Sequence, residues 1–167
     1  YRDTENDSLD RYVLPYRLLV DFTKNEDEQT TDFENGNIFY LGEIGLSKRA
    51  SYASEATVQD LLSTHCYMFN TTNSTFKDAS ARVAMSQALD RNKMAEIVTF
   101  AKPATGLVPY TVYDKSVGDS FRTNGGDLIS TSASSGSGSG RFTLTVRDNA
   151  SDVALAEYAK SVWEGMG

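Results

Sequence analysis

The chain has 167 residues, of which 40% are hydrophobic and 23% charged, so its composition is that of a folded domain with a hydrophobic core. Its formal net charge of −7 argues against a basic surface of the kind that nucleic acids and anionic membranes require. With one histidine and one cysteine, it has neither an internal disulfide nor a His/Cys metal cluster, and we expect no cofactor.

The first half of the chain is predicted to alternate between extended and helical segments. Apolar alternation and β-branched or aromatic residues predict strands over 16–22, 38–44 and 57–71. Helices are predicted over 25–35, with Phe33 as the apolar anchor, and over 46–55, with Ser47 as the cap. Cys66 lies in the third strand and is expected to be a buried thiol. Residues 1–13 form a polar lead-in to a single folded unit that spans 14–167.

The clearest helix signal lies between residues 78 and 90. Five small or apolar side chains recur at helical spacing and form one face, namely Ala81, Ala84, Met85, Ala88 and Leu89. Asp78 is placed to accept from the free N–H groups of the first turn. Asp90 ends this helix and can cap a second one, which contains Met94, Ile97 and Val98. The alanines allow another element to pack closely against the first helix.

The last part of the chain is predicted to end in a strand and a helix. Residues 114–135 are mostly loop, and the Gly/Ser alternation over 134–140 is typical of an engineered splice. A strand is predicted over 142–146. The helix that follows is capped by Ser151 and has an apolar face formed by Leu155, Ala159, Val162, Trp163 and Met166. Alternating strands and helices indicate an α/β fold.

Residues 69–91, FNTTNSTFKDASARVAMSQALDR, resemble the signature of the oligopeptide, dipeptide and nickel solute-binding proteins of ABC importers. The start of the signature is matched by Phe69, Asn70 and Thr71, and the remainder by Phe76, Asp78, Arg82, Ala84, Ala88, Leu89, Asp90 and Arg91. The loop from Pro103 to Pro109 and the final strand and helix also resemble this family. A helix that normally precedes the last strand is absent, and the Gly/Ser stretch takes its place.

This resemblance implies one lobe of a class II periplasmic-binding-protein-like fold, with a mixed sheet flanked by helices. Such a lobe closes with a second lobe around the ligand. The resemblance further implies a monomeric component that binds peptides and delivers them to the permease subunits of an ABC importer. It would be a cell-surface lipoprotein or a periplasmic protein, and it would perform no chemistry. A ligand-sensing lobe of a transcriptional regulator with the same fold is the alternative.

The candidate ligand contacts lie where strands end, because ligands of open α/β sheets bind at the carboxyl ends of strands. They are Tyr67, Phe69 and Asn70 at the end of the third strand, and Asn149, Ser151 and Asp152 at the turn into the last helix. Core packing for Tyr67 and helix capping for the turn remain the alternatives.

The most specific residues of the signature are interpreted as structural. They are Asp78, Arg82, Asp90 and Arg91, which as two caps and an adjacent ion pair would fix a helix–helix corner. His65 has no spacing to a nucleophile that would indicate catalysis, and it is expected to be a hydrogen-bonded or surface residue.

Overall fold

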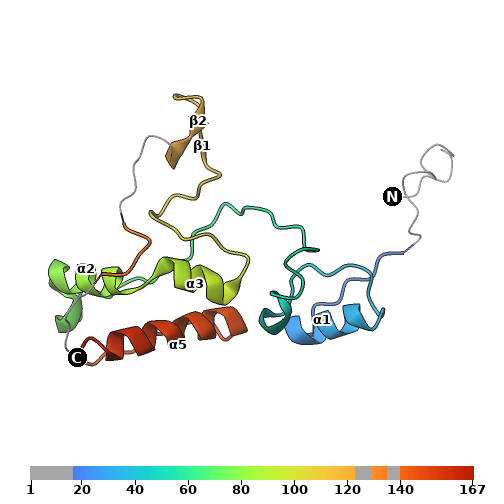
Figure 1. Ribbon diagram of the computed structural model, residues 1–167, viewed down its shortest axis with the longest axis horizontal. Helices are drawn as coiled ribbons and strands as arrows, with labels where there is room; N and C mark the ends of the chain where they lie inside the picture. The colour runs from blue at the N-terminus through green and yellow to red at the C-terminus, as the bar shows by residue number, and fades with distance from the viewer. Residues whose placement is uncertain (1–16, 123–128, 135–139) are drawn as a thin grey trace.

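The computed structural model describes residues 17–122, 129–134 and 140–167. Its elements are α1 (Glu26–Glu34), η2 (Leu46–Lys48), η3 (Ser74–Phe76), α2 (Ala79–Ala88), α3 (Arg91–Val98), β1 (Tyr113–Asp114), β2 (Asp119–Ser120) and α5 (Ala150–Glu164). Figure 1 shows α2 and α3 lying along α5, with α1 at one end of the molecule and the β1–β2 hairpin projecting away from the helices. The predicted lead-in at 1–13 lies outside the described residues, as does most of the predicted splice.

The first helix forms where the sequence predicts it because its ends are fixed locally. Asn25 caps α1 in a capping box: its side chain accepts from the backbone N–H of Glu28, and the Glu28 carboxylate accepts from that of Asn25. Gly36, with φ of 74°, supplies the left-handed residue that ends it. The prediction that Phe33 anchors this helix is wrong, since the residue is 37% exposed. Thr30 is the buried residue instead, and its hydroxyl accepts from the Gly45 N–H at 2.9 Å.

The corner between α2 and α3 has the two predicted aspartate caps. The Asp78 side chain accepts from Ser80 N at 2.9 Å, and Asp90 accepts from the backbone N–H groups of the first turn of α3. The predicted ion pair is not formed among the described residues. Arg82 donates instead to the carbonyls of Phe76 and Lys77, at 2.7 and 3.0 Å. The arginine therefore closes the turn before α2 through backbone acceptors.

The hydrophobic core lies where α5 crosses α2 and α3. Its buried members are Phe76, Met85, Ala88, Leu89, Ala159 and Trp163, which confirms the predicted apolar faces of α2 and α5. Ala159 is fully buried at the crossing, where its small side chain lets the helices approach closely. The predicted cap is wrong, because Asn149 and not Ser151 caps α5 by accepting from Asp152 N at 2.9 Å. The helix starts two residues earlier than expected, and asparagine is a strong cap.

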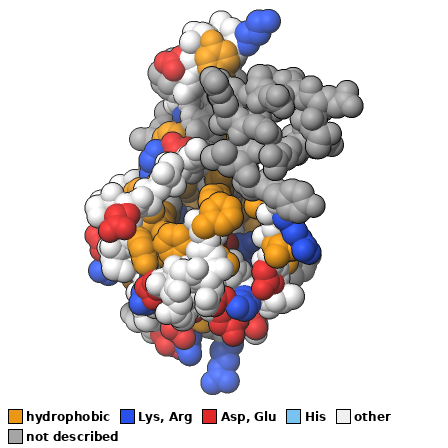
Figure 2. Space-filling view, turned by 90° about the vertical axis from the view of Figure 1, so that its right-hand side faces the viewer, with side chains coloured by type: hydrophobic (Ala, Val, Ile, Leu, Met, Phe, Trp, Pro, Cys, Tyr) orange, Lys and Arg blue, Asp and Glu red, His pale blue; other side chains and the backbone are white. Residues whose placement is uncertain are grey.

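The predicted mixed sheet is not formed among the described residues. The segments 17–22, 38–44, 57–70 and 142–146 have no strand partner, and the only described sheet is the β1–β2 hairpin, in a region predicted to be loop. A strand requires hydrogen bonds to a neighbour, and apolar alternation alone does not supply one. Large apolar side chains in these segments remain exposed, among them Phe22 at 87% and Met68 at 90%. Figure 2 shows hydrophobic side chains gathered on one open face of the molecule.

Two further predictions for the first half of the chain are wrong. Residues 46–55 form only the short η2 and a series of turns, because the segment has a thin apolar face to pack. Ser47 donates to the Asp27 carboxylate at 3.2 Å and does not cap a helix. Cys66 is exposed, since it lies in an extended segment that no described strand covers.

Candidate ligand-binding cleft

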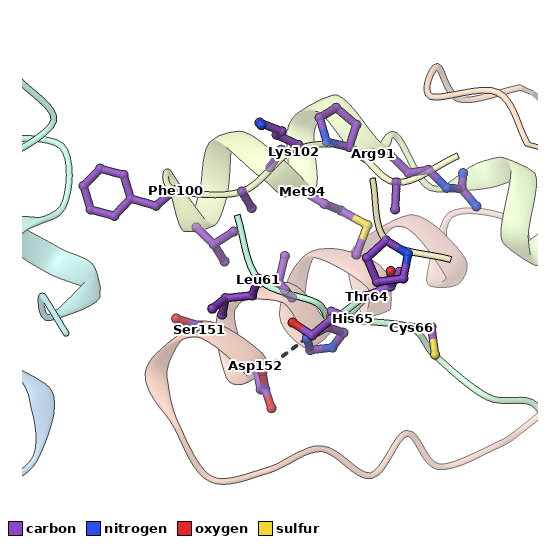
Figure 3. Close-up of a pocket in the computed structure, with 18 of the residues that line it drawn as sticks. Leu61, Thr64, His65, Cys66, Arg91, Met94, Phe100, Lys102, Ser151 and Asp152 are labelled. Carbon is purple, nitrogen blue, oxygen red and sulfur yellow. Dashed lines mark ion pairs between the residues drawn. The ribbon is translucent and has the colours of Figure 1, made fainter. Parts of the chain in front are cut away.

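A cleft of about 940 Å³ opens between three parts of the chain. The extended segment 58–67 forms one wall, α3 and the loop 99–111 form the other, and the N-terminus of α5 closes one end. In Figure 3, Leu61, Thr64 and His65 lie between Met94 and Lys102 on one side and Ser151 and Asp152 on the other. The apolar loop that ends at Pro109 is therefore a wall of the cleft and not a simple connector.

Five of the six candidate ligand contacts line this one cleft, although they come from segments about eighty residues apart. They are Tyr67, Phe69, Asn149, Ser151 and Asp152. Asn70 does not line it. Its side-chain oxygen accepts from the backbone and hydroxyl of Thr72, at 3.1 and 2.7 Å, and so closes the turn that leads into η3.

Tyr67 packs against the hydrophobic core and also lines the cleft. Its ring meets Trp163 and His65 edge to face, with centroid distances of 5.9 Å in both cases. Burial raises the pKa of the Tyr67 hydroxyl, and the charge of Asp152 raises it further. The hydroxyl oxygen is buried and has no hydrogen-bond partner among the described residues. Tyr67 thus connects the core to the polar end of the cleft.

The polar end of the cleft is organised around the buried carboxylate of Asp152. Arg147 donates to it from Nε at 2.6 Å and from Nη2 at 3.3 Å, and His65 Nδ1 lies 3.6 Å away. The hydrogen bonds from Arg147 are the main cause that lowers the pKa of Asp152 below its usual 3.8. Sequence reasoning missed Arg147. An arginine five residues before an aspartate, across a capping turn, is the signal that would have found it.

His65 is half-exposed and lies beside Asp152, which agrees with the expected surface or hydrogen-bonded role. Its neighbours in the described segments are the Asp152 carboxylate and the ring of Tyr67. The Ser151 hydroxyl oxygen, at the same end of the cleft, is buried and has no hydrogen-bond partner among the residues that the structure describes. The geometry around His65 is therefore that of a polar wall of the cleft.

Replacing Asp152 with asparagine is expected to lower the free energy of unfolding at neutral pH by about 1.5–3 kcal/mol, the value of hydrogen bonds to a charged group. Arg147 is 78% exposed, so the lower half of this range applies. Because folding lowers the pKa of Asp152, its stabilisation is present above pH 3.8 and disappears as the pH falls through the folded pKa. The free energy of unfolding, measured with urea between pH 7 and pH 3, should therefore fall less steeply with decreasing pH in the variant than in the wild type.

Glu157→Gln is the matched control for this measurement, because Glu157 is exposed on the same helix. It should leave the pH dependence of the free energy of unfolding unchanged. The same pH dependence for Asp152→Asn and the wild type would contradict the role assigned to the Arg147–Asp152 pair.

A largely apolar cleft of this size, with a few polar groups at one end, is the arrangement of a protein that binds a small ligand. Residues 12–167 match the family model described as bacterial extracellular solute-binding proteins, family 5, middle region. The chain belongs to this family, and the resemblance carried by residues 69–91 is confirmed. The family has a two-lobed periplasmic-binding-protein-like fold and acts outside the cytoplasm, with an ABC permease as partner and a small molecule as ligand.

Comparison with curated proteins and with solved structures gave no match. Across the described segments, no helix has the length and hydrophobicity needed to span a membrane.

Proposed function

We propose that this chain is one lobe of a peptide-binding protein that delivers its cargo to an ABC permease. The observation that carries the proposal is that five residues predicted as ligand contacts line a single cleft of about 940 Å³ in a member of a solute-binding family. The aromatic ring of Tyr67 and the hydroxyl and amide groups at the start of α5 suit the mixed polar and apolar surface of a peptide. Binding and release require no chemical step from these residues.

The one-lobe proposal is supported by the surface that the chain leaves uncovered. Large apolar side chains remain exposed on the extended segments that have no described strand partner, among them Leu18, Leu19 and Phe22. A folded domain normally buries most residues of this type. A second lobe that pairs with these segments would cover them and complete the cleft. The complete protein is then a monomer, anchored as a lipoprotein or free in the periplasm.

The engineered-splice proposal is supported by the two described ends of the Gly/Ser stretch. Ser134 N donates to the carbonyl of Gln87 at 2.9 Å, which places it against the end of α2. A Cβ at Gly140 would lie 3.1 Å from the Thr75 side chain, in η3 just before α2. The two described ends therefore lie at opposite ends of α2, a ten-residue helix roughly 15 Å long, a distance that a short run of small residues can span.

The proposed ligand class is tested by releasing and sequencing the solute that co-purifies with the two-lobed protein. Mass spectrometry should identify peptides, whereas a sugar, haem or metal chelate as the recovered solute would overturn the peptide assignment. The same peptides should bind the isolated 167-residue chain only in the millimolar range, because half of the cleft wall is missing. Micromolar binding by the isolated chain would contradict the one-lobe proposal.

A further inference from the structure

Arg91, the last residue of the family signature, lines the same cleft. Its Nη1 donates to the carbonyls of Leu89 and Ser130, at 3.2 and 3.3 Å, and its Nη2 donates to the Ser86 hydroxyl at 3.0 Å. These bonds connect the α2–α3 corner to the segment that follows residue 128. They engage three of the five N–H groups of a guanidinium, and the remaining two have no partner among the described residues.

All three acceptors of Arg91 are neutral, and no carboxylate pairs with it in the described segments. The side chain is partly buried, and this burial lowers the pKa of Arg91. Withdrawing a guanidinium from water without a counter-charge is unfavourable, because the lost hydration is not replaced by an ion pair. Among the described residues, Arg91 is thus a partly buried cation without a carboxylate partner.

The surrounding cleft is more positive than the rest of the chain. Five arginine or lysine side chains and four carboxylates line it, although the whole chain carries a net charge of −7. Three of these cations have a carboxylate within ion-pair distance, namely Arg49 with Glu26, Lys102 with Asp60, and Arg147 with Asp152. Arg91 differs from these three because its contacts are all uncharged.

We propose that Arg91 binds a carboxylate group of the ligand, with its two unused N–H groups donating to the carboxylate oxygens. A planar guanidinium matches the two oxygens of a carboxylate, and such charge-assisted pairs are stronger than neutral ones. Leu89, Met94 and Pro109 also line the cleft, so a ligand with an aliphatic body and a carboxylate end is favoured over a bare inorganic anion. This inference rests on the proposed binding function, because it requires that the cleft holds a solute.

The first test uses the wild-type 167-residue chain and three probes of equal length: sodium butyrate, 1-butanol and n-butylammonium chloride. Each is titrated while backbone amide resonances are followed by two-dimensional NMR. Butyrate should shift the amides of residues 89–95 and 130–131 at concentrations at which the alcohol and the ammonium do not. Its effect should weaken as sodium chloride is added. Equal shifts with butyrate and butanol would overturn the proposal, since the cleft would then respond to the alkyl chain alone.

The second test compares Arg91→Met with Arg82→Met. Arg82 is the matched control, because its hydrogen-bond acceptors are likewise uncharged but it does not line the cleft. Both variants remove a guanidinium that stabilises a turn, so both are expected to lose thermal stability. Only Arg91→Met should weaken butyrate binding, by about tenfold or more, the effect of losing hydrogen bonds to a charged group. Equal butyrate affinity in the two variants would overturn the proposal.

Phosphate is titrated in parallel to determine whether the site prefers a carboxylate or binds any anion. A response to phosphate equal to that of butyrate would overturn the carboxylate assignment. Failure of the proposed function gives a different pattern, in which butyrate still binds at Arg91 while the solute retained by the two-lobed protein carries a carboxylate but is not a peptide. The two proposals therefore fail independently.

Discussion

Replacing Trp163 with alanine is expected to lower the free energy of unfolding by about 3–5 kcal/mol, the usual cost of removing a buried tryptophan. The indole is buried between α5 and α2, and its Nε1 donates to the carbonyl of Met85 at 3.0 Å. Its ring also contacts Phe142 and Tyr67, with centroid distances of 5.6 and 5.9 Å. The substitution would therefore open a cavity, leave the Met85 carbonyl without this donor, and remove the support behind Tyr67.

The measurement is urea unfolding followed by far-ultraviolet circular dichroism, because Trp163 is the single tryptophan and its fluorescence is lost in the variant. Trp163→Phe is the control, since it keeps an aromatic ring but not the indole N–H. It should be more stable than Trp163→Ala and less stable than the wild type. A loss below 1 kcal/mol for the alanine variant would show that α5 is not packed on α2 as described.

The second large effect is expected for Phe76→Ala, also about 3–5 kcal/mol. The Phe76 ring is 6% exposed and lies 5.0 Å from the ring of Phe69 and 5.1 Å from that of Phe142. It packs the extended segment before α2 against the segment before α5. Its loss would therefore weaken the packing of both segments. Phe76 is also a member of the family signature, and its role in that signature is core packing.

Urea unfolding followed by Trp163 fluorescence measures this effect, with two controls. Phe76→Leu keeps most of the volume and should lose less than about 1.5 kcal/mol. Phe39→Ala removes a ring that is 80% exposed and should change stability by less than about 0.5 kcal/mol. Similar losses for Phe39→Ala and Phe76→Ala would contradict the assignment of Phe76 to the core.

The helices could be predicted from the sequence because their determinants are local. The apolar faces of α2 and α5 repeat at 3.6 residues, and Asp78 and Asp90 accept from N–H groups only two or three residues away. The starting residue of α5 was wrong because Asn149 and Ser151 are both capable caps. Local composition does not distinguish two such candidates that lie two residues apart.

The predicted strands depend on partners that are distant in sequence. Segments such as 17–22 and 57–70 have strand-like composition, yet no described strand pairs with them, and Cys66 is consequently exposed. The alternation of side chains indicates which ones share a face. It does not indicate whether another strand covers that face.

The candidate site was predicted in part, because turns that end strands and start helices can be located from the sequence. The sequence indicates Tyr67 and the start of α5, but it does not indicate that Arg147 neutralises Asp152. Arg91 was predicted to be structural, since its contact to Ser130 crosses about forty residues of sequence. Charge pairing across such separations depends on tertiary packing and cannot be read from spacing.

We expect the solute to bind in the cleft between the extended segment that ends at Phe69, α3 and the start of α5. Hydrogen–deuterium exchange of the complete two-lobed protein, with and without its co-purified solute, measures this binding. The solute should protect amides at 64–69, 91–95 and 149–153, and it should leave the exposed turns at 50–56 unchanged. Protection confined to segments outside the cleft, with these three ranges unaffected, would show that the solute binds elsewhere.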